Sequence, residues 1–274
     1  MKGSFEVGSQ VLAGKRKKLI AILISGWVLL SGIMISSCTL DPEKTREPPP
    51  VVIRVDDIQD FAFKEGQKFL FDEGLQNNIP LSLAVIPGAF GEDQEMVEML
   101  KLVAGGNSEV TVHGWMHENL AAFSYEKQLE LLGQSQERMV QVLNHSPTIL
   151  VPPMFSFNKD TLSAMSETGY GIISSFTNSG KPGIISKVRS VPGTVNLSDY
   201  GDNTWTMKDR DSLQTEISGS VNKYGFAVIV THPQEFMVEE ELDPGKVQLF
   251  QNLVNFLKEG YTISTLSELA TRLS

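Results

Sequence analysis

Short apolar runs alternate with segments of helical periodicity from Val51 to the end of the chain. The first run, Val51–Asp56, is rich in β-branched residues and has the length of a buried strand. Between the runs, apolar residues recur at the three- and four-residue spacing of an amphipathic helix, as they do within residues 92–103. The pattern predicts strands at 51–56, 81–86, 109–113, 148–151, 170–174, 226–231 and 261–264. It predicts helices at 61–77, 92–103, 124–143, 158–167, 211–222, 244–258 and 266–272.

The repeated order of strand and helix decides the fold class. It predicts an α/β domain with a parallel sheet and helices outside it, either closed as a barrel or open. From Gly171, within the strand predicted at 170–174, to Trp205 the chain is loop-rich and is its least readable part. In folds of this kind, functional side chains lie at the carboxyl ends of the strands. Polar residues that follow a predicted strand are therefore the first candidates for a site.

A basic segment and an apolar run precede this domain. Lys15–Lys18 are followed by the uncharged run Leu19–Ile35, which leads into Ser36, Ser37 and Cys38. A basic segment before an apolar run is typical of an export signal. Small residues directly before a lone cysteine resemble a lipoprotein signal, in which that cysteine is lipidated after cleavage. An uncleaved signal anchor is the alternative, and both predict an exported protein held at the extracytoplasmic face of a membrane.

The sequence thus divides into a signal peptide or membrane anchor at 1–37, a proline-rich spacer at 38–50 and an α/β catalytic domain at 51–274. The chain has 23 Lys and Arg against 33 Asp and Glu, a net charge of −10, so nucleic acid is not an expected partner. Cys38 is the single cysteine, which excludes an internal disulfide framework and a multi-cysteine zinc site. A metal site in the domain would have to use imidazoles and carboxylates.

Histidines and aspartates follow several of the predicted strands. Asp56 and Asp57 end the first strand, His113 ends the third and His232 follows a late one. His113 and His117 are four residues apart, a spacing that brings both imidazoles to one face of a helical turn, where they can share a metal ion. One aspartate can complete such a site and leave the other as a general base. The alternative is a polar pair on a surface turn.

At these residues the sequence resembles the polysaccharide deacetylases of the NodB-homology type, also called carbohydrate esterase family 4. The resemblance implies a distorted (β/α)7 barrel after the N-terminal signal or lipoprotein segment. It implies that Asp56 is the general base, and that His232 is the general acid. It also implies that Asp57, His113 and His117 bind one divalent metal ion, with zinc preferred over cobalt, nickel or another divalent ion. The implied reaction is hydrolysis of acyl groups, chiefly N-acetyl, on an extracytoplasmic carbohydrate.

Two motifs depart from the family pattern. The third motif, usually Arg-Pro-Pro-Tyr-Gly, reads Val-Pro-Pro-Met-Phe at 151–155, so the arginine that orients the base is missing. Arg54, Arg189 or Arg210 could replace it, and the sequence does not choose among them. The Met154 N–H is expected to help hold the oxyanion, with Pro153 beside it in the pocket. A fourth motif of aspartate near tryptophan has a loose counterpart in Asp202 and Trp205, and the latter is expected to line the pocket.

These departures leave two other functions open. One is a metal-dependent amidase that acts on a non-sugar amide. The other is a non-catalytic module that uses the pocket to bind glycan. His145 lies in a turn after a helix and is expected to be a solvent-exposed residue outside the site.

Overall fold

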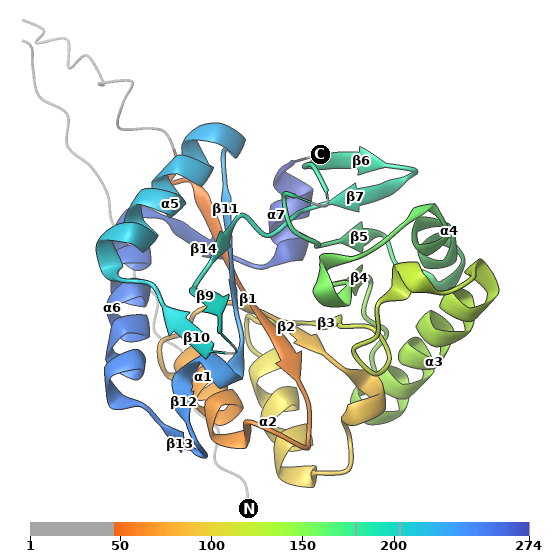
Figure 1. Ribbon diagram of the computed structural model, residues 1–274, viewed down its shortest axis with the longest axis horizontal. Helices are drawn as coiled ribbons and strands as arrows, with labels where there is room; N and C mark the ends of the chain where they lie inside the picture. The colour runs from red at the N-terminus through yellow and green to blue at the C-terminus, as the bar shows by residue number, and fades with distance from the viewer. Residues whose placement is uncertain (1–46, 179, 203, 274) are drawn as a thin grey trace, which may run out of the picture. The chain divides into compact units, whose positions relative to one another are not determined.

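The structure is a computed structural model that describes residues 47–178, 180–202 and 204–273 (Figure 1). The predicted signal or anchor at 1–37, and all of the 38–50 spacer except its last four residues, lie outside the described residues. Within the described ranges, no helix is both long enough and apolar enough to cross a membrane.

Parallel strands form the centre of the domain. In the described part of the chain they are β1 (Pro50–Ile58), β2 (Leu81–Val85), β3 (Glu109–Val112), β4 (Ile149–Leu150), β5 (Ile172–Ile173), β7 (Val188–Ser190), β8 (Val195–Asn196) and β11 (Ala227–Thr231). The start of β1 also pairs with β14 (Thr262–Ser264), and β6 (Gly183–Ile185) runs antiparallel to β7.

A single crossing segment, residues 188–197, closes this sheet into a barrel. Its first part contains β7, and the N–H groups of Val191 and Gly193 donate to carbonyls of β5 and the residues after it. Its second part contains β8, and the N–H groups of Thr194 and Leu197 donate to carbonyls of β11. When β7 and β8 are counted as one crossing strand, the described residues form a distorted barrel of seven parallel strands, as expected.

Helices surround the barrel (Figure 1). They are α1 (Lys64–Gln76), α2 (Gln94–Ala104), α3 (Tyr125–Leu143), α4 (Lys159–Thr168), α5 (Arg210–Tyr224), α6 (Pro244–Gly260) and α7 (Leu266–Arg272). Ser124 caps α3 by accepting a hydrogen bond from the Lys127 N–H, and Asp93 caps α2 in the same way through the N–H groups of Glu95 and Met96. The helices predicted from periodicity are all present, with ends that differ by a few residues.

The two faces of β1 pack against different layers. Val51, Ile53 and Val55 belong to the large core between barrel and helices. Val52, on the opposite face, packs inside the barrel in a cluster that includes Leu266 of α7. Both faces are buried, which explains the unbroken apolar run in the sequence. Arg54 and Asp56 continue the inward face of β1, so the barrel interior changes from apolar to charged toward its carboxyl end.

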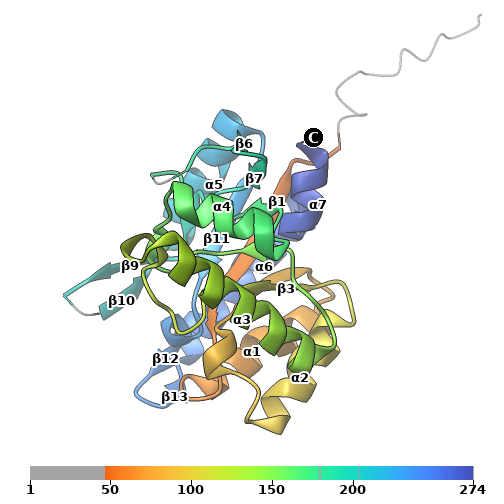
Figure 2. The ribbon, with the colours of Figure 1, turned by 90° about the vertical axis from the view of Figure 1, so that its right-hand side faces the viewer.

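Short hairpins at the carboxyl ends of the strands were not predicted. β9 (Ser198–Gly201) pairs with β10 (Thr204–Met207), and β12 (Met237–Val238) pairs with β13 (Glu241–Leu242). In Figure 2 the β9–β10 hairpin projects from the body of the domain. Strands of two to four residues are too short to show a period of two, and for that reason residues 171–205 were interpreted as loop-rich.

Candidate active site at the carboxyl ends of the strands

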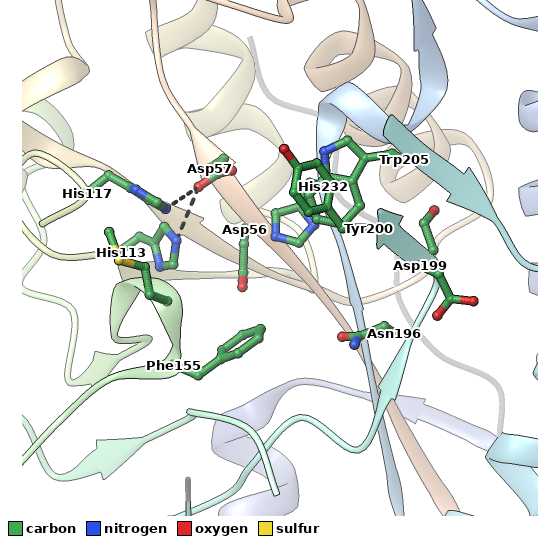
Figure 3. A pocket seen from close by; sticks show the side chains of 12 residues that line it. Asp56, Asp57, His113, His117, Phe155, Asn196, Asp199, Tyr200, Trp205 and His232 are labelled. Carbon is green, nitrogen blue, oxygen red and sulfur yellow. Dashed lines mark ion pairs between the residues drawn. The ribbon is translucent and has the colours of Figure 1, made fainter. Parts of the chain in front are cut away.

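A pocket of about 650 Å³ opens at the carboxyl ends of the barrel strands (Figure 3). Its lining consists of Asp56, Asp57, His113, His117, Met154, Phe155, Asn196, Ser198, Asp199, Tyr200, Trp205 and His232. Nearly all of the residues singled out from the sequence therefore meet in one place. Pro153, which is buried, does not line the pocket, and neither does Asp202. His145 is exposed and lies outside this pocket, as expected.

Asp57 and the two histidines bring three potential ligand atoms together. Oδ1 of Asp57 lies 3.2 Å from Nε2 of His113 and 3.3 Å from Nε2 of His117 (Figure 3). One ligand atom from each residue lies within 4.8 Å of the others. Asp57 Oδ1 is buried, and among the described residues no donor meets it with hydrogen-bond geometry, despite the two close imidazoles. A buried carboxylate oxygen facing two imidazole nitrogens is a donor set that suits zinc or a similar divalent ion.

Neighbouring groups fix the orientation of these ligands. The carbonyl of Val151 can only accept, so Nδ1 of His113, 2.8 Å away, donates to it and the ring is oriented with Nε2 toward Asp57. The Gln234 amide donates to Oδ2 of Asp57 at 2.9 Å. Burial alone would raise the pKa of Asp57, but the contacts with His113 and His117 hold it well below its usual range. The contact with Asp57 raises the pKa of His117.

The turn that carries the two histidines is not helical, which corrects the expectation from their spacing. Gly114 has a φ of 69° and His117 a φ of 61°, so the chain enters the left-handed region at both residues. Glu118 accepts hydrogen bonds from the N–H groups of Trp115 and Met116 and closes the turn. A Cβ at Gly114 would lie 2.9 Å from the Pro153 ring. The imidazoles meet because the chain folds back on itself, with ring centroids 5.1 Å apart.

Asp56 is held by an arginine from its own strand. Nε of Arg54 donates to Oδ1 of Asp56 at 2.8 Å, and Nη2 donates to Oδ2 at 2.7 Å. Both side chains are buried, with exposures of 0% and 1%. Of the arginines that could replace the missing one, Arg189 instead donates to the Leu273 carbonyl and Arg210 is exposed at the start of α5. Arg54 is the one that reaches the aspartate.

His232 faces the other side of the pocket and has a partner that the sequence did not reveal. Its Nδ1 lies 2.7 Å from Oε1 of Glu235, which is 1% exposed. Oε2 of Glu235 accepts from the hydroxyls of Ser198 and Thr231. Burial alone would lower the pKa of His232, but the hydrogen bond with Glu235 and nearby carboxylate charges raise it overall. The only sequence signal was the three-residue spacing of His232 and Glu235 around Pro233.

Aromatic residues of the β9–β10 hairpin extend from His232. The Trp205 ring lies 4.7 Å from the His232 ring, and the Tyr200 ring lies 4.9 Å from Trp205 (Figure 3). Trp205 lines the pocket as expected, but Asp202 does not, and Asp199 and Tyr200 are there instead. Tyr200, Asn196 and Ser198 come from the stretch that the sequence left unassigned.

The residues after β4 form the opposite wall. Met154 has a φ of 54° and Phe155 a φ of 55°, two left-handed residues in succession. Among the described residues, none accepts a hydrogen bond from the Met154 N–H. Phe155 packs on Phe176 and covers the Arg54 guanidinium, whose Cζ is 5.6 Å from the ring centre. The altered third motif thus places an aromatic ring where the family has glycine.

Comparison with known proteins supports the resemblance to polysaccharide deacetylases that the sequence motifs indicated. Residues 44–173 match the family model described as polysaccharide deacetylase. A comparison with curated protein sequences finds no significant match.

Solved structures share the fold at low sequence identity. A Mycobacterium smegmatis protein designated a polysaccharide deacetylase is 15% identical, with a TM-score of 0.65 over 84% of this chain and 91% of that one. The peptidoglycan deacetylase PdaC from Bacillus subtilis is 16% identical, with a TM-score of 0.54 over 82% and 91%. A family 4 pseudoenzyme from Bacillus anthracis, BA3943, is 14% identical, with a TM-score of 0.56 over 83% and 70%. Residues 44–173 are therefore similar to the polysaccharide deacetylase family, and the described domain shares its fold with solved structures that carry that name at low sequence identity.

Proposed function

We propose that the protein is a metal-dependent hydrolase that removes acyl groups, chiefly N-acetyl, from an extracytoplasmic carbohydrate. The observation that carries the proposal is the convergence of Asp57, His113 and His117 on one point, with Asp56 and His232 facing the same pocket. A divalent cation held by the first three would act there as a Lewis acid toward the acyl carbonyl and would lower the pKa of bound water.

Asp56 and His232 divide the proton transfers between them. Asp56 does not belong to the ligand cluster, so its carboxylate is available to take the proton of the attacking water as general base. His232 protonates the leaving amine as general acid. The hydrogen bond from Nδ1 to Glu235 leaves Nε2 to carry the proton that is transferred. The hydrogen bond with Glu235 and the nearby carboxylate charges raise the pKa of His232, which favours its protonated form.

The backbone of Met154 assists at the acyl group. Met154 lines the pocket, and a preorganised backbone N–H at this residue can stabilise the negative charge that develops on the carbonyl oxygen. A backbone donor does not depend on side-chain identity, so this role survives the change from tyrosine to methionine. Trp205 and Tyr200 offer flat apolar faces on which a sugar ring can stack.

The test is a panel of acetylated chitooligosaccharides, peptidoglycan fragments, acetyl-xylan and small amides, with released acid as the readout. We expect Asp56→Asn and His232→Ala each to lower kcat by at least about 100-fold, since general acid or base groups contribute ~10²–10⁴-fold. Both variants should keep metal content near that of wild type. His113→Ala/His117→Ala should lose metal and activity together. If Asp56→Asn emptied the metal site instead, the two aspartates would have exchanged roles.

The same panel separates the other candidate functions. Turnover of small amides alone would identify an amidase of non-sugar substrates. Binding of glycan without turnover would identify a binding module, an outcome that the altered third motif and the fold shared with the BA3943 pseudoenzyme make worth testing.

We further propose that the protein acts outside the cytoplasm and is held at the membrane by a lipid on Cys38. The basic segment, the apolar run and the lone cysteine in residues 15–38 support this. The proline-rich residues 48–50 lead directly into β1, so the spacer would connect the anchor to the barrel without an intervening domain.

A further inference from the structure

We propose that Arg54 is a positioning residue for the general base and does from strand β1 the work of the arginine that the third motif lacks. This inference rests on the proposed function, because it concerns the base of that reaction. It goes beyond it in assigning a role to a residue outside the family motifs and in explaining how the site tolerates Val151.

Arg54 fixes the plane of the Asp56 carboxylate. Its Nε and Nη2 contact the two carboxylate oxygens separately, at 2.8 and 2.7 Å, in the bidentate arrangement that a guanidinium offers and an ammonium does not. A carboxylate held at both oxygens has one orientation left.

The other end of the guanidinium is fixed across the barrel. Nη1 of Arg54 donates to the carbonyl and hydroxyl of Ser174, at 2.8 and 3.0 Å, and to the carbonyl of Ser175 at 3.0 Å. These residues directly follow β5, which β2, β3 and β4 separate from β1 in the sheet. The base is therefore positioned against two walls of the barrel.

Stability alone does not account for this pair. An ion pair buried this completely loses hydration on both sides, and apolar side chains of similar volume often serve as well or better. Removing one member, in contrast, leaves a buried charge without a partner. A buried arginine that contacts the one aspartate next to the ligand Asp57 is thus better explained by what it does to that aspartate.

Val151 and Arg54 point into the same interior space. Val151 packs in the barrel cluster with Val52, and Val52 lies on the same face of β1 as Arg54 because they are two residues apart. The carbonyl of Val151 contacts His113, so the side chain at 151 starts close to the metal ligands. A guanidinium could approach Asp56 from position 54 or from position 151, and the packed interior has room for one of them.

This predicts that an arginine at position 151 can replace the one at position 54. We would measure kcat, KM, metal content and thermal unfolding for the wild type, Arg54→Met, Val151→Arg and the double variant Arg54→Met/Val151→Arg. We expect Arg54→Met to lower kcat by about 30-fold or more, within the range of general-base catalysis, with KM and metal content within about twofold of wild type. The double variant should recover at least about tenfold of that loss. Val151→Arg alone should unfold at a lower temperature, because two guanidinium groups would compete for one space.

A conservative variant tests the two-point contact without leaving Asp56 unpaired. Arg54→Lys keeps the charge but cannot contact both oxygens in the same way, so kcat should fall while the fold and the metal content remain. Unchanged kcat in Arg54→Lys, or a folded and metal-bound double variant with no recovery, would overturn the proposal.

One readout does not depend on turnover. In ¹⁵N NMR spectra, the Arg54 Nε–H should be protected from solvent exchange and should shift in Asp56→Asn. If the wild type hydrolysed nothing in the panel but this signal behaved as expected, the proposed function would be wrong and the contact between Arg54 and Asp56 would still be supported. If the signal were exposed or did not shift, the pair itself would be wrong.

Discussion

Glu235 shows how one buried carboxylate can set the working range of the site. It is 1% exposed, accepts from two hydroxyls through one oxygen and from His232 Nδ1 through the other. A histidine that acts as general acid must be protonated, so activity should be present below its pKa and be lost as the pH rises through it. Since Glu235 raises the pKa of His232, we expect it to extend activity toward alkaline pH if His232 is the general acid.

Glu235→Gln should therefore move the alkaline limb of the kcat profile to lower pH. The glutamine can still accept a hydrogen bond from Nδ1, but it lacks the negative charge that favours imidazolium. The measurement is kcat against pH on a substrate from the panel. Asp199→Asn is the matched control, because Asp199 also lines the pocket but its side chain is 76% exposed, where solvent screens its charge. Equal shifts of the alkaline limb in Glu235→Gln and Asp199→Asn would show that the effect is not specific to Glu235.

Among individual residues, the sequence predicted the polar side chains that lie at the carboxyl ends of strands. Asp56, Asp57, His113 and His232 could be placed at one edge because parallel strands present their carboxyl ends together. Their supporting partners could not be predicted. Arg54 was one of three candidate arginines until β1 was seen to point it inward, and Glu235 follows its histidine by a spacing that any surface turn can have.

Helix α1 positions the segment after His232, the proposed general acid, through a close backbone contact. A Cβ built on Gly66 would lie 2.4 Å from the carbonyl oxygen of Pro233, the residue after His232. The short helix that begins at Pro233 carries Gln234, which contacts Asp57, and Glu235, which contacts His232. The absence of a side chain at Gly66 thus sets the distance between a surface helix and two functional contacts.

Gly66→Ala should destabilise the protein and lower its activity. The neighbour is a main-chain carbonyl that cannot rotate away, so we expect a loss of about 1–3 kcal/mol and a displaced 233–235 segment. Thermal unfolding and kcat would be measured together. In Gly133→Ala, the control in helix α3, a new Cβ meets nothing within 4 Å, and a gain of about 0.5–1 kcal/mol is expected from helix propensity. A Gly66→Ala protein as stable and active as wild type would contradict this contact.

The elements were predictable wherever a periodicity had room to develop. Helix α3 is nineteen residues long and was expected at nearly the observed bounds. β8, β9 and β10 have two to four residues each, and their pairing depends on β11 and on each other rather than on local sequence. The pocket wall that carries Tyr200 and Trp205 could therefore not be predicted.

For the whole molecule, the proposed lipid anchor at the N-terminus leads to a separate prediction about processing and membrane attachment. If Cys38 is lipidated, Cys38→Ala should block processing at that position and leave a longer precursor in the membrane fraction. The comparison is a fractionation and mass measurement of wild type and variant in a host that modifies lipoproteins. The control is Cys38→Ala with an added conventional signal-peptidase cleavage site, which should release the domain from the membrane. Unchanged mass and anchoring in Cys38→Ala would favour the uncleaved signal anchor.

The position of β1 in the barrel wall, between β2 and β11, has a consequence for how the chain acquires its fold. Among the strands of the described residues, β1 is synthesised first, yet Val51 pairs with Ala227 on one side and with Ile263 of β14 on the other. Contacts of such sequence separation form slowly, because a long loop must close before they stabilise anything. Asp56 and Asp57 thus leave the ribosome early, but strand β1 can pair with β11 and β14 only after almost the entire polypeptide has been synthesised. If the domain is exported, as we propose, translocation in an unfolded state is compatible with this order of assembly.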